Sequence, residues 1–124
     1  MNPTNIETAD AYVGCLGLDF GTTNSVAAIV KPNGSVRTAQ FSNQGTTEPV
    51  CRSVMSFFKS EGVSSVEVGP WAMERYLADP SECRFLQSFK TFAASPSFHS
   101  TIIHGRSWRY EDLMAAFLER MLAN

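Results

Sequence analysis

The chain has no apolar run long enough to cross a membrane and no excess of positive charge. About 20 consecutive apolar residues are needed to span a bilayer, and none of the runs in the 124 residues approaches that length. The formal net charge of −2 provides no electrostatic attraction to nucleic acid or to an anionic membrane surface. Residues 1–7 have neither a basic start nor an apolar core, so we expect no secretory signal. We therefore predict neither a nucleic-acid partner nor a membrane partner.

Cysteine is also scarce. The three cysteines, Cys15, Cys51 and Cys83, are odd in number and far apart, and none has the paired spacing of metal ligands. Free thiols persist in a reducing compartment, so the sequence predicts a cytoplasmic protein without a disulfide framework. With 44% hydrophobic and 18% charged residues, the composition is that of a globular protein, and the length suggests one domain.

The most informative stretch is residues 15–30, where two short apolar runs flank a group of small and polar residues. The runs contain β-branched residues and are too short for helices, which predicts a strand, a tight turn and a second strand. Gly21 would permit a backbone conformation closed to residues with a Cβ, and would let a ligand approach the main chain. The amides from Gly21 to Asn24 could then point into one concavity and bind an anion such as phosphate.

Neighbouring side chains fit the same interpretation. Thr22 and Thr23 add hydroxyl donors, and Asp19 places a carboxylate where a phosphate-bound magnesium ion or its water shell would lie. The pattern differs from the glycine-rich loop that opens a helix in P-loop proteins. An ordinary buried hairpin, in which Asp19 and Gly21 only make the turn, explains the same residues, so composition leaves both interpretations open.

The rest of the chain alternates between short strand patterns and two helical patterns. We expect a loose tail at 1–12 and a loop at 42–52. The expected strands are 12–20, 25–31, 36–41, 53–58, 66–69 and 100–103, the first three forming an antiparallel meander with a turn at 32–34, where Asn-Gly tolerates positive φ. The expected helices are 71–77 and 110–124. The second helix is amphipathic, with its apolar stripe formed by Leu113, Met114, Phe117, Leu118 and Met121.

The string Gly17-Leu18-Asp19-Phe20-Gly21-Thr22-Thr23-Asn24-Ser25 closely resembles the first phosphate motif of the DnaK-like heat shock protein 70 family of chaperones. These chaperones belong to the actin, sugar-kinase and heat-shock ATPase superfamily. Later segments, Asn43-Gln44-Gly45 and Val68-Gly69-Pro70-Trp71-Ala72, also resemble the family. The resemblance covers residues 13–124. It implies the first subdomain of an α/β, ribonuclease H-like (actin-like ATPase) fold, with a five-stranded mixed sheet and packed helices.

Lys90 lies in the segment 84–92, which contains three phenylalanines, Phe85, Phe89 and Phe92. A solvated lysine whose stem covers apolar neighbours is one interpretation. In the DnaK-like family, however, a lysine after the Val-Gly-x-x-Ala helix contacts the γ-phosphate and the attacking water. Divergent members carry it as Lys-Ser/Thr-Phe, as in Lys90-Thr91-Phe92 here. The resemblance therefore implies a divergent branch in which Lys90 is the catalytic cation.

The resemblance further implies that ATP or ADP with magnesium is the cofactor, and that hydrolysis drives protein folding and client release. Gly21, Thr22, Thr23 and Asn24 would bind the phosphates, and Asp19 would act in catalysis by orienting magnesium through water. Lys90 would offset charge that develops on the γ-phosphate.

The chain lacks the second phosphate loop of this family, typically Asp-Leu-Gly-Gly-Gly-Thr, and a peptide-binding domain. We therefore expect a fragment with an incomplete ATPase fold and negligible turnover, whose uncovered apolar surface favours self-association. Unfolded client proteins and co-chaperones would be partners only of a full-length protein. Two alternatives are a sugar or acid kinase of the same superfamily, in which an acceptor hydroxyl replaces water, and a non-enzymatic binding module.

Overall fold

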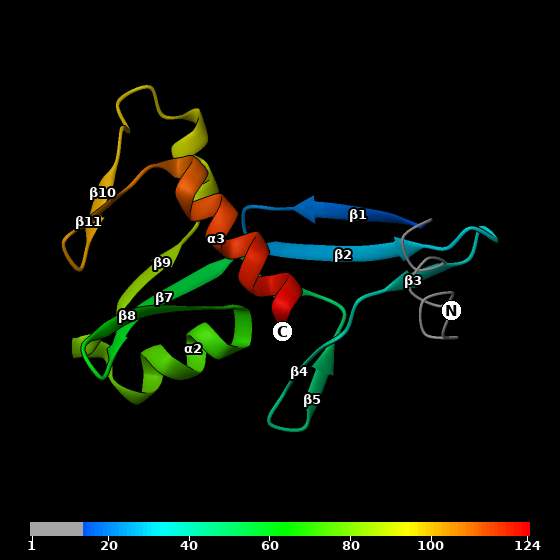
Figure 1. Cartoon of the computed structure of the whole chain (residues 1–124), viewed down its shortest axis with the longest axis horizontal. Coiled ribbons are helices and arrows are strands. Elements are labelled where there is room, and N and C mark those ends of the chain that lie inside the picture. Colours follow the sequence, from blue (N-terminus) through cyan, green and yellow to red (C-terminus); the bar gives the residue numbers. More distant parts are fainter. Residues whose placement is uncertain (1–13) are drawn as a thin grey trace, which may run out of the picture.

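The computed structural model describes residues 14–124, and Figure 1 shows their arrangement. The tail expected at 1–12 lies outside these residues. The described part of the chain is a mixed α/β structure with two α-helices, and all its strand pairings are antiparallel. No helix within residues 14–124 is both long enough and apolar enough to cross a bilayer.

The first sheet contains β1 (Cys15–Phe20), β2 (Asn24–Val30) and β3 (Val36–Thr38) in that order. The predicted antiparallel meander is confirmed, although the third strand ends at Thr38. In the turn before it, only Gly34 has a positive φ (85°), and the Asn33 side chain accepts a hydrogen bond from the Ser35 amide (2.9 Å). A fourth strand, β6 (Cys51–Arg52), pairs with the beginning of β2.

The second sheet has β7 (Val54–Ser60) at its centre, between β8 (Val63–Val68) and β9 (Arg84–Gln87). The strands expected at 53–58 and 66–69 are present, but β9 was not predicted. Helix α2 (Gly69–Ala78) packs on β7 and β8, with Ala72 fully buried. The helix begins two residues earlier than expected, with Pro70 in its first turn, and the short 3-10 helix η1 (Pro80–Glu82) follows it.

The structure contains two small hairpins outside these sheets. The first, β4 (Phe41–Asn43) with β5 (Thr46–Glu48), lies in the region expected to be a loop, 42–52, except for Phe41, which was expected in the third strand. The second pairs β10 (Thr101–Ile103) with β11 (Arg106–Trp108). Two-residue turns with positive φ at both positions close them, at Gln44-Gly45 (51° and 80°) and His104-Gly105 (50° and 80°). Such turns usually begin with Asn, Asp or Gly, so Gln and His at the first position gave little signal.

Helix α3 (Tyr110–Ala123) covers the second sheet and contacts β8. The Asp112 carboxylate accepts a hydrogen bond from the Arg109 amide (2.8 Å), which satisfies one free amide at the helix start. The predicted apolar stripe is confirmed, since its members Leu113, Phe117 and Met121 are buried. They join a core that contains Ala27, Phe41, Cys51, Met55, Phe57, Val68, Leu86, Phe89, Ile103 and Trp108.

The single five-stranded mixed sheet implied by the resemblance does not form among residues 14–124. Instead there are a four-stranded sheet, a three-stranded sheet and two hairpins. The chain from Cys51 to Ser60 passes from the first sheet to the second, with Ser53 at the break between β6 and β7. β6 pairs with β2, whereas β7 pairs with β8 and β9. The first part of this segment therefore belongs to the first sheet and the second part to the second sheet.

Candidate functional site: a surface turn beside a lysine

The turn between β1 and β2 lies at the surface. The Gly21 amide donates a hydrogen bond to the Asn24 carbonyl (3.0 Å), which closes the turn, and the residues Thr22, Thr23 and Asn24 are exposed. Within residues 14–124, no hydrogen bond uses the amide N–H of Thr22 or of Thr23. Two adjacent amides that are free to donate are the type of group that binds an anion in a backbone concavity.

Gly21 is required here for a different reason from the one expected. Its φ is not among the positive values found in residues 14–124, so the backbone conformation itself is open to other residues. A Cβ at this position would instead collide with the carbonyl oxygen of Asn24. The close approach of the Asn24 carbonyl, which the hydrogen bond from Gly21 maintains, therefore leaves no room for a side chain at Gly21.

Two buried serines hold the back of this turn. The Ser53 amide donates to the Thr23 carbonyl (2.8 Å), and the Ser53 hydroxyl donates to the Gly21 carbonyl (2.7 Å). The Ser25 and Ser53 hydroxyls are 2.8 Å apart. A hydroxyl has one proton, and that of Ser53 is used by Gly21, so Ser25 donates to Ser53. Ser53 thus holds the Thr23 and Gly21 carbonyls, and Ser25 holds the Ser53 hydroxyl. The sequence analysis gave neither serine a role at the turn.

Lys90 reaches this turn from a segment 70 residues away. It lies on the 3-10 helix η2 (Phe89–Ala94), and its Nζ donates a hydrogen bond to the Phe20 carbonyl (2.6 Å). An ammonium group has three donors, so two remain for other acceptors. Ser88, with a φ of 54°, reverses the chain immediately before η2, and its carbonyl accepts bonds from the Thr91 amide (3.1 Å) and hydroxyl (2.7 Å).

A cluster of three phenylalanines fixes η2 against the end of β1. The ring centroids of Phe20, Phe89 and Phe117 are 5.4 to 5.6 Å apart in all three pairs. Such aromatic pairs contribute about 0.5–1.5 kcal/mol each beyond their buried area. Because Phe20 precedes Gly21 and Phe89 precedes Lys90, this cluster positions the lysine beside the turn.

A second cation lies at the same turn. Thr22, Thr23, Arg52 and Ser88 line a depression of about 30 Å³, which is room for about one water molecule. Arg52 is exposed, and it forms no ion pair with the part of the chain that the structure describes. The sequence analysis missed Arg52 because its position depends on the pairing of β6 with Asn24.

The structure does not place Asp19 in contact with the other candidates. Asp19 is exposed on β1 opposite Val26, and within residues 14–124 its carboxylate makes no ion pair and no side-chain hydrogen bond. No three His, Cys, Asp or Glu side chains in this range lie close enough to hold a metal ion. A magnesium ion here would therefore take most of its oxygen ligands from phosphate and water.

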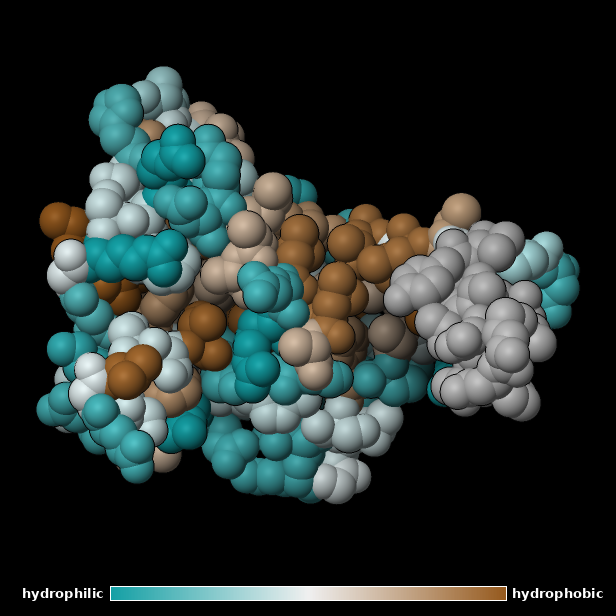
Figure 2. Space-filling model, in the orientation of Figure 1, coloured by the Kyte–Doolittle hydropathy of each residue, from teal (hydrophilic) through white to brown (hydrophobic). Residues whose placement is uncertain are grey.

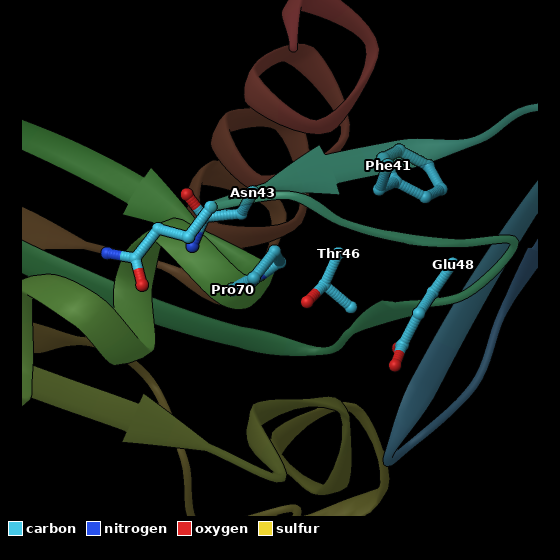
Figure 3. A pocket seen from close by; sticks show the side chains of 6 residues that line it. Phe41, Asn43, Thr46, Glu48 and Pro70 are labelled. Atoms are coloured by element: carbon cyan, nitrogen blue, oxygen red, sulfur yellow. The ribbon is translucent and has the colours of Figure 1, made fainter.

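A larger cavity lies elsewhere on the surface, between the β4–β5 hairpin and the start of α2. Its volume is about 290 Å³, and its lining includes Phe41, Asn43, Thr46, Glu48 and Pro70, which Figure 3 shows as sticks. It shares no lining residue with the depression at Thr22 and Thr23. This cavity is therefore separate from the candidate phosphate site.

Comparison with known proteins gives no relative for this chain. No protein-family model, no curated protein and no solved structure matches it. Any functional assignment therefore depends on the residues of the turn, on the neighbouring cations and on the resemblance of the sequence motif.

Proposed function

We propose that the turn from Gly21 to Asn24 binds the phosphates of ATP or ADP, as part of the ATPase domain of a cytoplasmic DnaK-like chaperone. The observation that carries this proposal is the 2.6 Å contact between the Lys90 ammonium and the Phe20 carbonyl. It places a cation directly beside a surface turn whose Thr22 and Thr23 amides are free to donate within the described residues. In this proposal the two sheets belong to a ribonuclease H-like, actin-like fold.

Each group at the turn has a distinct part in the proposed chemistry. The Thr22 and Thr23 amides and hydroxyls donate hydrogen bonds to phosphate oxygens. Lys90 and Arg52 neutralise phosphate charge, and phosphoryl transfer depends on such neutralisation more than on covalent help from the protein. A magnesium ion, when bound, shields the phosphates further, and Asp19 orients its water shell.

The residues described here supply only half of such a site. The depression at the turn has a volume of about 30 Å³, which is far too small for a nucleotide. In the DnaK-like family a second lobe provides the other phosphate loop and the adenosine pocket. The proposal therefore assigns weak phosphate binding, with a dissociation constant on the order of 1 mM, to this chain, and assigns hydrolysis, client proteins and co-chaperones to a protein with both lobes.

Phosphate binding can be tested by amide chemical shifts during titration with magnesium tripolyphosphate and with magnesium ATP, up to about 10 mM. Both should shift the amides of Thr22, Thr23 and Ser88, because the shared triphosphate makes the contacts. Lys90→Ala should weaken the effect, and Lys31→Ala, which removes an exposed lysine that follows β2, should leave it unchanged. Shifts that avoid the turn, or that are identical in the Lys90→Ala variant, would overturn the proposal.

The catalytic part of the proposal needs a protein that contains this chain together with the second phosphate loop. There, Lys90→Ala should slow ATP hydrolysis about 100-fold, as the loss of one transition-state donor typically does. The affinity for ATP should change much less, since the contact is strongest in the transition state. Hydrolysis at the parent rate would show that Lys90 is not the catalytic cation, and phosphate transfer to glycerol or a sugar would identify a kinase.

A further inference from the structure

We propose a second ligand site, for a small aromatic carboxylate, in the cavity between β8 and the β10–β11 hairpin. The cavity has a volume of about 230 Å³ and contains none of the residues assigned to the phosphate site. Its base is formed by Phe57, Ile103 and Trp108, and its rim by Ser64, His104 and Arg106.

The base of the cavity is apolar and well fixed. The exposed fractions of Phe57, Ile103 and Trp108 are 1%, 2% and 9%. The Phe57 and Trp108 rings meet edge to face, with centroids 5.0 Å apart and an interplanar angle of 64°. Pockets for small organic molecules typically combine such an apolar base with a few convergent polar groups.

The polar groups at the rim include one cation held in place. The Arg106 guanidinium lies 3.9 Å from the centre of the Trp108 ring, so the arginine is stacked on the base of the cavity. Arg106 is exposed and has no ion-pair partner among residues 14–124. A planar guanidinium presents paired donors that match the two oxygens of a carboxylate. The stacked arginine is thus oriented to receive an anionic group at the rim.

His104 fixes the rim on the other side of the cavity. Its Nδ1 lies 2.9 Å from the Ser64 hydroxyl on β8, which ties the hairpin turn to the second sheet. His104 and Gly105 form the tight turn of the hairpin, and Arg106 follows directly, opposite Ile103 in the strand pairing. The contact with Ser64 therefore also sets the position from which Arg106 extends.

The size and charge of the cavity define its ligand. A volume of about 230 Å³ lies below the roughly 300–1,000 Å³ of pockets for drug-sized molecules, which excludes a nucleotide. Because Phe57 and Ile103 are almost completely covered, a ligand ring would contact Val66 and the exposed part of Trp108, and its carboxylate would pair with Arg106. Inorganic phosphate would use the cation and leave the apolar base empty, so a ring with a single carboxylate is the better match.

Tryptophan fluorescence provides a direct test, because Trp108 forms part of the site and the chain has only one other tryptophan. In the Trp71→Phe variant, phenylacetate should cause a saturable change in the Trp108 emission. Phenylacetamide, which has the same ring but no charge, should bind at least about 10-fold more weakly, because a charge-assisted hydrogen bond is lost.

Substitutions distinguish binding at this site from a general effect of removing a positive charge. Arg106→Gln should weaken phenylacetate binding about 10-fold or more, and Arg37→Gln, at an exposed arginine of β3, should leave it unchanged. Amide shifts at Ser64 and at residues 103–108 should accompany binding and locate the ligand. The proposal is wrong if no saturable change occurs, if the acid and the amide bind equally, or if Arg106→Gln binds like the parent.

Discussion

The first sheet and the second sheet differ in how much of their surface is covered. In β7, the central strand of the second sheet, every residue from Val54 to Phe57 is buried, whereas every residue of β1 from Cys15 to Asp19 is exposed. Helices α2 and α3 pack against the second sheet. Figure 2 shows apolar surface gathered where β1 and β2 lie in Figure 1, and Leu16, Leu18 and Ile29 are 42–51% exposed.

Most of the buried contacts that stabilise the chain therefore lie in the second sheet, whereas the candidate phosphate site lies in the first. The turn at Gly21–Asn24 belongs to the less covered sheet, and it is joined to the rest of the molecule by Ser53 and by the Phe20 cluster. Regions with few buried contacts open locally at lower free energy than the core does. The first sheet should therefore tolerate substitution along β1 and be sensitive at these two connections, in the turn itself and at Ala27, the residue of β2 that belongs to the core.

The largest effect should come from the second sheet. Phe57→Ala should lower the free energy of unfolding by about 3–5 kcal/mol, because it removes a buried ring that contacts Trp108 and leaves a cavity. A loss of that size approaches the whole stability of a small domain, so much of the chain should be unfolded without denaturant. Urea unfolding followed by circular dichroism measures this. If the variant kept most of the parent stability, Phe57 would not be part of the core.

The next effect should appear at the turn itself. Gly21→Ala should lower the free energy of unfolding by about 1–3 kcal/mol, because the added Cβ collides with the Asn24 carbonyl and the turn must open. Gly17→Ala in the same strand is a matched control, since the nearest atom to its Cβ is the Ala28 carbonyl oxygen at 3.8 Å, an ordinary contact. The same urea titration compares the two variants. Equal stabilities would mean that the turn is not closed as tightly as described.

The third effect depends on pH and contrasts two cysteines. Burial raises the pKa of the Cys51 thiol from its ordinary value of 9.0 to about 12. Because the folded pKa exceeds the unfolded one, this contribution to stability is complete below pH 9 and falls as pH rises from 9 toward 12. By pH 10 the loss should be about 1.4 kcal/mol.

The corresponding measurement is the free energy of unfolding between pH 8 and pH 10. Cys51→Ala should reduce the slope against pH, because the group that ionises on unfolding is removed. Cys15→Ala, which removes the exposed thiol of β1, is the matched control for the loss of a cysteine. If Cys51→Ala retained the full slope, other groups would account for the pH dependence.

Local patterns in the sequence were sufficient to predict the β1–β2 hairpin, from two short apolar runs around a polar turn, and helix α3, from a five-residue apolar stripe at helical spacing. They did not predict β9, or the β4–β5 hairpin, whose turn begins with Gln44 and not with Asn, Asp or Gly. Nor could they predict which strands belong to which sheet, because that depends on the break at Ser53 between β6 and β7.

The same distinction applies to the candidate site. The residues of the turn and Lys90 were predicted from two sequence motifs. The structure places Lys90 beside the turn, and its catalytic role stays a prediction. Ser53 and Arg52 had no local signal. Their place at the turn results from a strand pairing between segments 28 residues apart, which neither periodicity nor spacing reveals.

The smallest effect on stability should come from β1. Leu18→Thr should change the free energy of unfolding by no more than about 0.5 kcal/mol, because Leu18 is 42% exposed and threonine suits a strand. Its effect should appear in self-association instead. Within residues 14–124 β1 pairs only with β2, and an uncovered apolar strand edge favours contact with a second chain. Light scattering should show less association for Leu18→Thr than for the parent, and a large loss of stability would mean that the uncovered sheet contributes to the core after all.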